Sequence, residues 1–208
     1  MGEKLQQISS SVLPSRGASA NITLPGDGNT LIAQANVVNM KSVYIPVVQT
    51  NGVTLPTRRT VNADYYNLFV IGDETFTGGY FIVPKKCALT ESITPELKAL
   101  YAKLDMDAIA AIKTFPAIFA GKNHQYCCAG GNQEAYLGFV NDISIQDNGI
   151  RVSFHLLYAI PQSRLNELAF EISIDCASAF NEFDSTHWTI KRINIIEKLR
   201  NSGIDALL

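Results

Sequence analysis

Polar and apolar residues alternate in the stretch LGFVNDISIQDNGIRVSFHLLY, residues 137–158, and this period of two predicts β-strands. Asn148-Gly149 in its middle predicts a two-residue hairpin turn. That turn sets Asp142 opposite His155 on the more polar face of the hairpin. A carboxylate in this position can fix the tautomer of an imidazole. Because the sequence shows no nucleophile that would use this pair, a structural role is the simpler interpretation of Asp142 and His155.

The segment THWTIK, residues 186–191, alternates in the same way and predicts a half-buried strand. Trp188 and Ile190 should face the core, while His187 and Lys191 should point to the opposite, solvated face. A final helix should follow, because Asn194 can serve as its N-cap and a glycine at position 203 can end it.

Apolar residues spaced three and four apart predict helices elsewhere in the chain. Thr94 and Asp105 are suitable N-caps for two short helices in tandem, and Pro116 should end or kink the second. A further amphipathic helix is expected from Pro161 to about Ser173.

Strand-forming residues dominate the region before these helices. The stretch KSVYIPVVQTNGVTLPTRRTV, residues 41–61, has two β-rich arms around Asn51-Gly52, a strong hairpin signal. Pro46 and Pro56 cannot donate backbone hydrogen bonds, so the arms should lie at a sheet edge or be bulged.

The order of these elements predicts an α+β fold. We expect a flexible tail at residues 1–19 and a single domain at 20–208. Within it, residues 20–90 should be β-rich, 94–120 helical, and 134–208 a ββαβα unit. Strands grouped before helices, rather than a steady alternation of the two, exclude a doubly wound fold.

The composition is that of a globular protein of 208 residues, with 47% hydrophobic and 17% charged residues. A formal net charge of −2 argues against a general nucleic-acid or membrane-surface binder. Local binding of nucleic acid stays possible, though not favoured, through six basic residues: Arg58, Arg59, Lys85, Lys86, Lys191 and Arg192. Solvated strand faces are the simpler interpretation of these basic pairs.

The N-terminal region does not predict export or membrane insertion. The stretch LQQISSSVL is too polar for the core of a signal peptide. No apolar run approaches the roughly 20 residues of a membrane helix. We therefore expect a cytoplasmic protein with no membrane partner.

Four cysteines, Cys87, Cys127, Cys128 and Cys176, do not form the pattern of a disulfide framework. His124 lies just before the adjacent Cys127 and Cys128, but a structural zinc site needs a second pair of ligands. We expect no metal and no cofactor, and reduced thiols in a glycine-bounded loop.

The strongest candidate for catalysis is the cluster of Glu182, Asp184, His187 and Lys191. Two carboxylates could hold a divalent metal while a histidine or lysine handles a proton, which is the chemistry of a metal-dependent hydrolase. Against this, Asp184 is at an even position and His187 at an odd one, so an extended strand would set their side chains on opposite faces. A strand edge with solvated polar residues is the simpler interpretation.

Whether the chain is an enzyme is not decided by its sequence, but a non-enzymatic protein is favoured. We expect a non-enzymatic binding or protein-interaction protein, as a component of a bacterial multi-protein system, with a protein partner or a second copy of itself. The alternative is a metal-dependent hydrolase or nuclease that acts on a nucleotide or nucleic acid.

Overall fold

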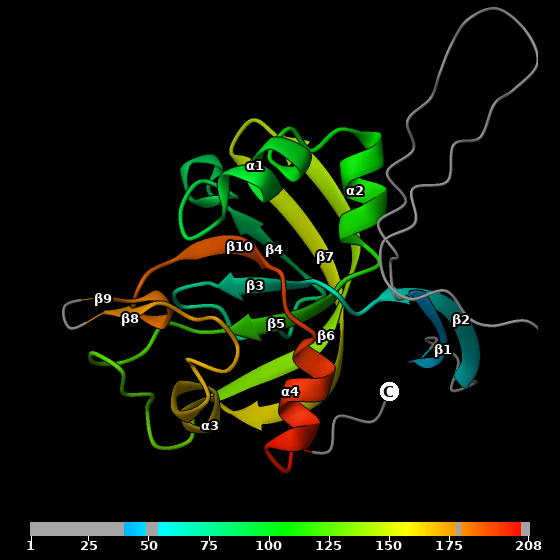
Figure 1. Ribbon diagram of the computed structural model, residues 1–208. Coiled ribbons are helices and arrows are strands. Elements are labelled where there is room, and N and C mark those ends of the chain that lie inside the picture. The colour runs from blue at the N-terminus through cyan, green and yellow to red at the C-terminus, as the bar shows by residue number, and fades with distance from the viewer. Residues whose placement is uncertain (1–39, 49–53, 178–179, 205–208) are drawn as a thin grey trace, which may run out of the picture. The chain divides into compact units, whose positions relative to one another are not determined.

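A six-stranded mixed sheet is the centre of the computed structural model, which describes residues 40–48, 54–177 and 180–204 (Figure 1). The strand order is β10-β3-β5-β6-β7-β4. Only β3 and β5 are parallel neighbours in this sheet. The strands are β3 (Tyr66–Val70), β4 (Tyr80–Val83), β5 (Pro116–Ala120), β6 (Glu134–Gln146), β7 (Gly149–Pro161) and β10 (His187–Lys191). With the helices described below, the chain has an α+β fold.

Two small antiparallel sheets accompany the main one. The predicted N-terminal arms form the first, from β1 (Met40–Val48) and β2 (Thr54–Asn62). The turn between them, the expected tail at 1–19 and the expected strand region at 20–39 lie outside the described residues. The second is formed by β8 (Cys176–Ala177) and β9 (Phe180–Asn181).

The main sheet curls strongly. The chain leaving β4 returns to β10 at the other end of the strand order, where Leu89 N donates to Trp188 O over 2.8 Å. The rings of Phe69 in β3 and Phe81 in β4 lie 5.3 Å apart, although three strands separate β3 from β4 in the sheet. The inner face therefore holds a continuous aromatic core, in which Phe69 also stacks on Trp188.

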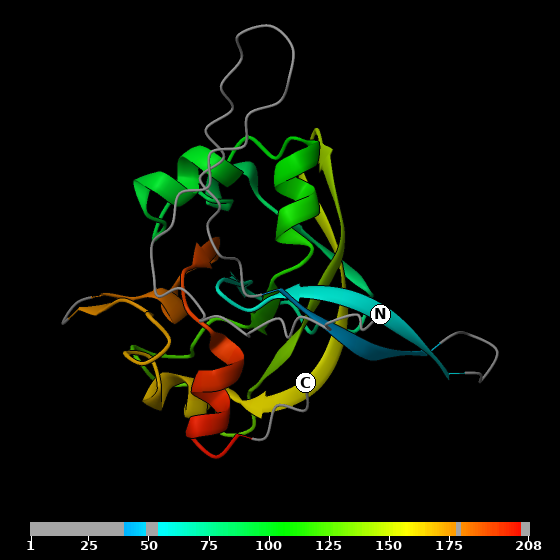
Figure 2. The same cartoon turned by 45° about the vertical axis from the view of Figure 1, so that its right-hand side comes forward.

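Helices contribute to the core on both faces of the sheet (Figures 1 and 2). The helices α1 (Pro95–Tyr101) and α2 (Met106–Ile112) pack into the inner cluster, and α3 (Gln162–Glu167) and α4 (Ile195–Asn201) pack into the outer one. The predicted N-caps Thr94, Asp105 and Asn194 are confirmed by their side-chain hydrogen bonds. The helix expected up to Ser173 is shorter, since α3 ends at Glu167 and turns follow. In the described part of the chain, no helix has the length and apolar character needed to span a membrane.

The prediction that residues 94–120 are helical is wrong at its C-terminal end. Pro116–Ala120 is β5, and all five of its residues are buried. Both faces of β5 are covered, so its sequence PAIFA is continuously apolar. An apolar run without alternation cannot be assigned to a strand or a helix by its period.

The predicted register of the β6–β7 hairpin is also wrong. The ladder continues to Gln146 opposite Gly149, so the turn consists of Asp147 and Asn148. Asp142 consequently lies opposite Ser153 rather than His155. A β-bulge next to Val140 then shifts the pairing again, which sets His155 opposite Phe139.

Gly149, in the predicted turn, is required for a different structural reason. A Cβ atom on Gly149 would lie 2.7 Å from the carbonyl oxygen of Val83 in β4. Glycine thus permits the close approach of a third strand, which the sequence of the hairpin alone does not reveal.

Candidate functional site

A groove of about 750 Å³ lies beside the end of β10, within the size range of sites that hold a small molecule or a few side chains. Its lining comes from four separate parts of the chain: residues 92–94, residues 170–176, Glu182 and Lys191. Glu182 begins the short 3₁₀ helix η2 (Glu182–Asp184), and Lys191 ends β10. Two of the predicted site residues therefore meet in this groove.

Glu182 and Lys191 form a buried ion pair. Lys191 Nζ lies 2.6 Å from Glu182 Oε1, and the Glu182 side chain has no exposed surface. Lys191 Nζ also donates to the carbonyl oxygen of Ser92 over 3.1 Å. The Asp175 backbone N–H donates to Glu182 Oε1. These contacts connect the two segments that line the groove, residues 92–94 and 170–176, to the end of β10.

The protonation of this pair follows from its surroundings. Burial by itself would raise the pKa of Glu182, but the neighbouring His187 imidazole and Lys191 ammonium lower the pKa below its ordinary value. Glu182 is therefore an ionised carboxylate at neutral pH. The ion pair with Glu182 and the hydrogen bond to Ser92 O both engage the Nζ atom of Lys191.

His187 belongs to the same cluster, but the prediction of a solvated His187 is wrong. Its exposed fraction is only 2%. Its Nδ1 lies 3.0 Å from Ser185 O and its Nε2 lies 3.6 Å from Glu182 Oε2, so both ring nitrogens face oxygen acceptors. The strand β10 is buried along Trp188, Thr189 and Ile190 as well, because hydrophobic clusters cover both sides of the sheet.

Asp184, the fourth member of the predicted cluster, has a different partner. Asp184 Oδ1 accepts a hydrogen bond from Asn123 Nδ2 over 2.9 Å. Asn123 also exchanges hydrogen bonds with Asn166 and accepts one from Gln162, which is fully buried. This amide network was not predicted, because its members come from three distant segments and match no motif.

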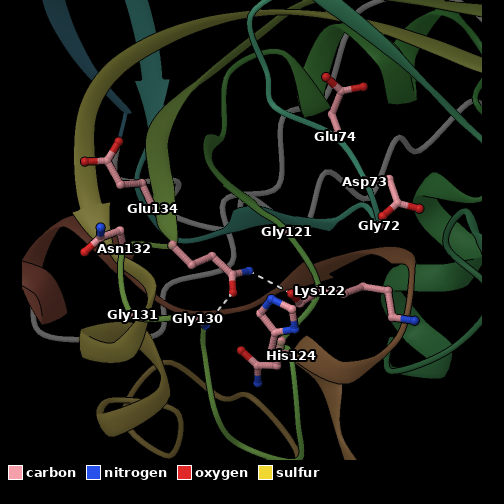
Figure 3. A pocket seen from close by; sticks show the side chains of 12 residues that line it. Gly72, Asp73, Glu74, Gly121, Lys122, His124, Gly130, Gly131, Asn132 and Glu134 are labelled. Atoms are coloured by element: carbon pink, nitrogen blue, oxygen red, sulfur yellow. Dashed lines mark hydrogen bonds between the residues drawn. The ribbon is translucent and has the colours of Figure 1, made fainter.

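Asn123 also lines a second hollow, of about 620 Å³, which Figure 3 shows from close by. Asp73 and Glu74 lie on one side of it, and Asn132 and Glu134 on the other. The Gln133 side chain donates to the carbonyl oxygen of Lys122 and accepts from the N–H of Gly130, which holds the loop together. Acidic, basic and amide groups are mixed here, so the hollow does not favour one ligand charge.

The basic residues proposed from the sequence lie on different elements. Arg58 and Arg59 are in β2, the exposed Lys85 and Lys86 are in the short 3₁₀ helix η1 (Lys85–Cys87), and the exposed Arg192 follows β10.

Arg59 has a structural contact that the sequence did not indicate. Its guanidinium lies 4.6 Å from the centre of the Phe139 ring and donates to the carbonyl oxygens of Lys113 and Val140. Burial lowers the pKa of Arg59. The side chain therefore holds β2 against the bulged part of β6.

Asp142, from the predicted pair with His155, contacts Lys113 instead. Its Oδ1 lies 3.6 Å from Lys113 Nζ, and both side chains are exposed. The four cysteines, all in the described part of the chain, are free thiols. Among the described residues, no three His, Cys, Asp or Glu side chains gather closely enough to hold a metal ion.

No family model, curated protein or solved structure matches this chain.

Proposed function

We propose that this chain is a non-enzymatic binding protein that docks a segment of a partner protein in the groove beside β10. The observation that carries the proposal is Phe170, whose exposed fraction of 91% is the highest among the exposed large hydrophobic side chains described. Phe170 borders the groove, together with Ile93 and Ile174. Single exposed apolar residues are common on protein surfaces. Aromatic residues, however, are enriched in protein–protein interfaces, so an exposed ring at the edge of a groove supports its use as an anchor for a partner.

The charges around the groove indicate the chemistry of the partner. Asp175 lines the groove and Glu171 follows Phe170 in the chain; both are exposed, and neither forms an ion pair within the described residues. Glu182 is already neutralised by Lys191. The partner segment that fits therefore carries an apolar side chain flanked by lysine or arginine.

The buried ion pair supports binding rather than catalysis. Lys191 already has Glu182 Oε1 and Ser92 O as acceptors, and its charge is held by the carboxylate. The alternative of a metal-dependent hydrolase has less support, since it requires Glu182 and Asp184 to share one ion. Glu182 is instead held by Lys191, and Asp184 by Asn123.

A selection from a random peptide library displayed on phage tests the proposal. With the full chain as bait, we expect enrichment of peptides that contain an apolar residue next to Lys or Arg. The enriched peptides should lose binding to Phe170→Ala. They should keep binding to Met106→Ala, because Met106 is similarly exposed, at 87%, but lies in α2 and does not line the groove.

Two results would contradict the proposal. The first is a selection that enriches no peptides beyond those from an uncoated surface. The second is enrichment of peptides that bind Phe170→Ala as well as the unaltered chain, which would place the binding surface elsewhere.

A further inference from the structure

Two cysteines from distant parts of the sequence share one hydrogen-bond donor. Asn181 Nδ2 lies 3.1 Å from Cys127 Sγ and 3.5 Å from Cys176 Sγ. Two sulfur atoms this close to one nitrogen are near neighbours. Cys127 lies in the loop between β5 and β6, and Cys176 begins β8.

The donor that holds the two sulfur atoms is itself fixed. Asn181 is buried, and its Oδ1 accepts from the Phe183 N–H over 2.8 Å as the N-cap of η2. The amide group cannot rotate without losing that hydrogen bond. Its N–H groups therefore point at the sulfur atoms in the folded protein.

Both thiols can be reached by a small reagent. Cys176 is exposed and Cys127 is partly exposed. The Tyr126 hydroxyl also interacts with Cys127, and this hydrogen bond raises the pKa of Tyr126. The thiolate is the form that attacks a disulfide. Burial raises the pKa of Cys176, so Cys127 is the better candidate for the first attack.

We propose that Cys127 and Cys176 are a redox modification site, which a small-molecule disulfide converts into an intramolecular disulfide bond. In the first step, the Cys127 thiolate attacks one sulfur of the reagent, and one reagent thiolate leaves. In the second, the Cys176 thiolate attacks Cys127 Sγ and expels the other reagent thiolate. The two cysteines lose two electrons and two protons. The reagent gains both electrons, and its two thiolates take up the protons.

The new bond would connect two parts of the surface that Asn181 now links through its hydrogen bonds to the two sulfur atoms. Cys176 lines the groove, and the loop that carries Cys127 also contributes residues to the second hollow. Oxidation would thus fix the 170–176 wall of the groove to that loop. This inference does not depend on the proposed partner, because the bond forms in the isolated chain.

Oxidised glutathione added to the full reduced chain tests the proposal. Mass spectrometry should show the loss of two hydrogen atoms, and peptide mapping without reductant should find one linked pair, Cys127 with Cys176. Cys128→Ser and Cys87→Ser should still form this link. Cys127→Ser and Cys176→Ser should instead stop at one mixed disulfide with glutathione on the remaining member of the pair.

Three outcomes would overturn the proposal. They are a link between Cys127 and Cys128, stable glutathione adducts on both Cys127 and Cys176 without a link, and no reaction at either residue. Circular dichroism of each serine variant before oxidation identifies any that fails to fold. The Cys128→Ser variant removes the competing neighbour, so the result for the pair can be read from it alone.

Discussion

Glu182 is the residue whose environment differs most from what the sequence indicates. A carboxylate without exposed surface is costly unless opposite charge and hydrogen bonds compensate for its lost hydration. Here Lys191 and the Asp175 N–H both contact Oε1, and His187 faces Oε2. Residue types in the segment 182–191 drew attention to this cluster. Its burial could not be inferred, because Ser92 and Asp175, which complete it, lie outside that segment.

The ion pair predicts a large effect of removing Lys191. Lys191→Met leaves Glu182 charged and buried without its partner, and should lower the free energy of unfolding by about 3–5 kcal/mol. The double variant with Glu182→Gln should lose less than the sum of the two single changes, since it removes both charges. Urea denaturation measures all three. Lys198→Met, at an exposed position of α4, is the control and should change stability by no more than about 0.5 kcal/mol.

The lowered pKa of Glu182 predicts how stability depends on pH. A carboxyl group with a folded-state pKa below its ordinary value of 4.5 stabilises the fold above that pH. This contribution is lost as the pH falls through the lowered pKa. Stability of the unaltered chain should therefore decline below about pH 4.5 more steeply than that of Glu182→Gln. Equal slopes in urea denaturation across this range would contradict the assigned role.

At the scale of secondary structure, the sequence predicts a feature correctly where interactions between nearby residues decide it. The three predicted N-caps are examples, since each cap bonds an N–H three residues away. The β6–β7 register was wrong because distant contacts decide it. Gly149 serves the approach of β4, and the bulge next to Val140 has the Arg59 guanidinium bonded to its carbonyl oxygen.

The second irregularity in the β6–β7 ladder gives a test of this account. A Cβ atom on Gly138 would lie 2.1 Å from the carbonyl oxygen of His155, so the backbone of one strand must shift. Gly138→Ala should therefore lower the free energy of unfolding by about 1–3 kcal/mol. Gly131→Ala is the matched control, because nothing lies within 4 Å of the added atom, and its effect should stay within about 1 kcal/mol. Equal stability of the two variants, measured in urea, would show that the close approach is not a constraint.

At the scale of the whole molecule, the curl of the sheet explains both the burial of β10 and the position of the groove. The burial of Trp188 and Ile190 was predicted from alternation, but that of His187 was not. Alternation identifies two faces of a strand and cannot show that both are covered. The groove could not be predicted from the sequence either, because residues 92–94 and 170–176 come together only in the folded chain.

The claim that the groove docks a partner segment is tested most directly by the affinity of one library-selected peptide for three forms of the full chain. Fluorescence anisotropy of the labelled peptide should show binding to Phe170→Ala at least about tenfold weaker, equivalent to about 1.4 kcal/mol. Binding to Met106→Ala should match that of the unaltered chain. Equal affinity for Phe170→Ala and the unaltered chain would contradict the account.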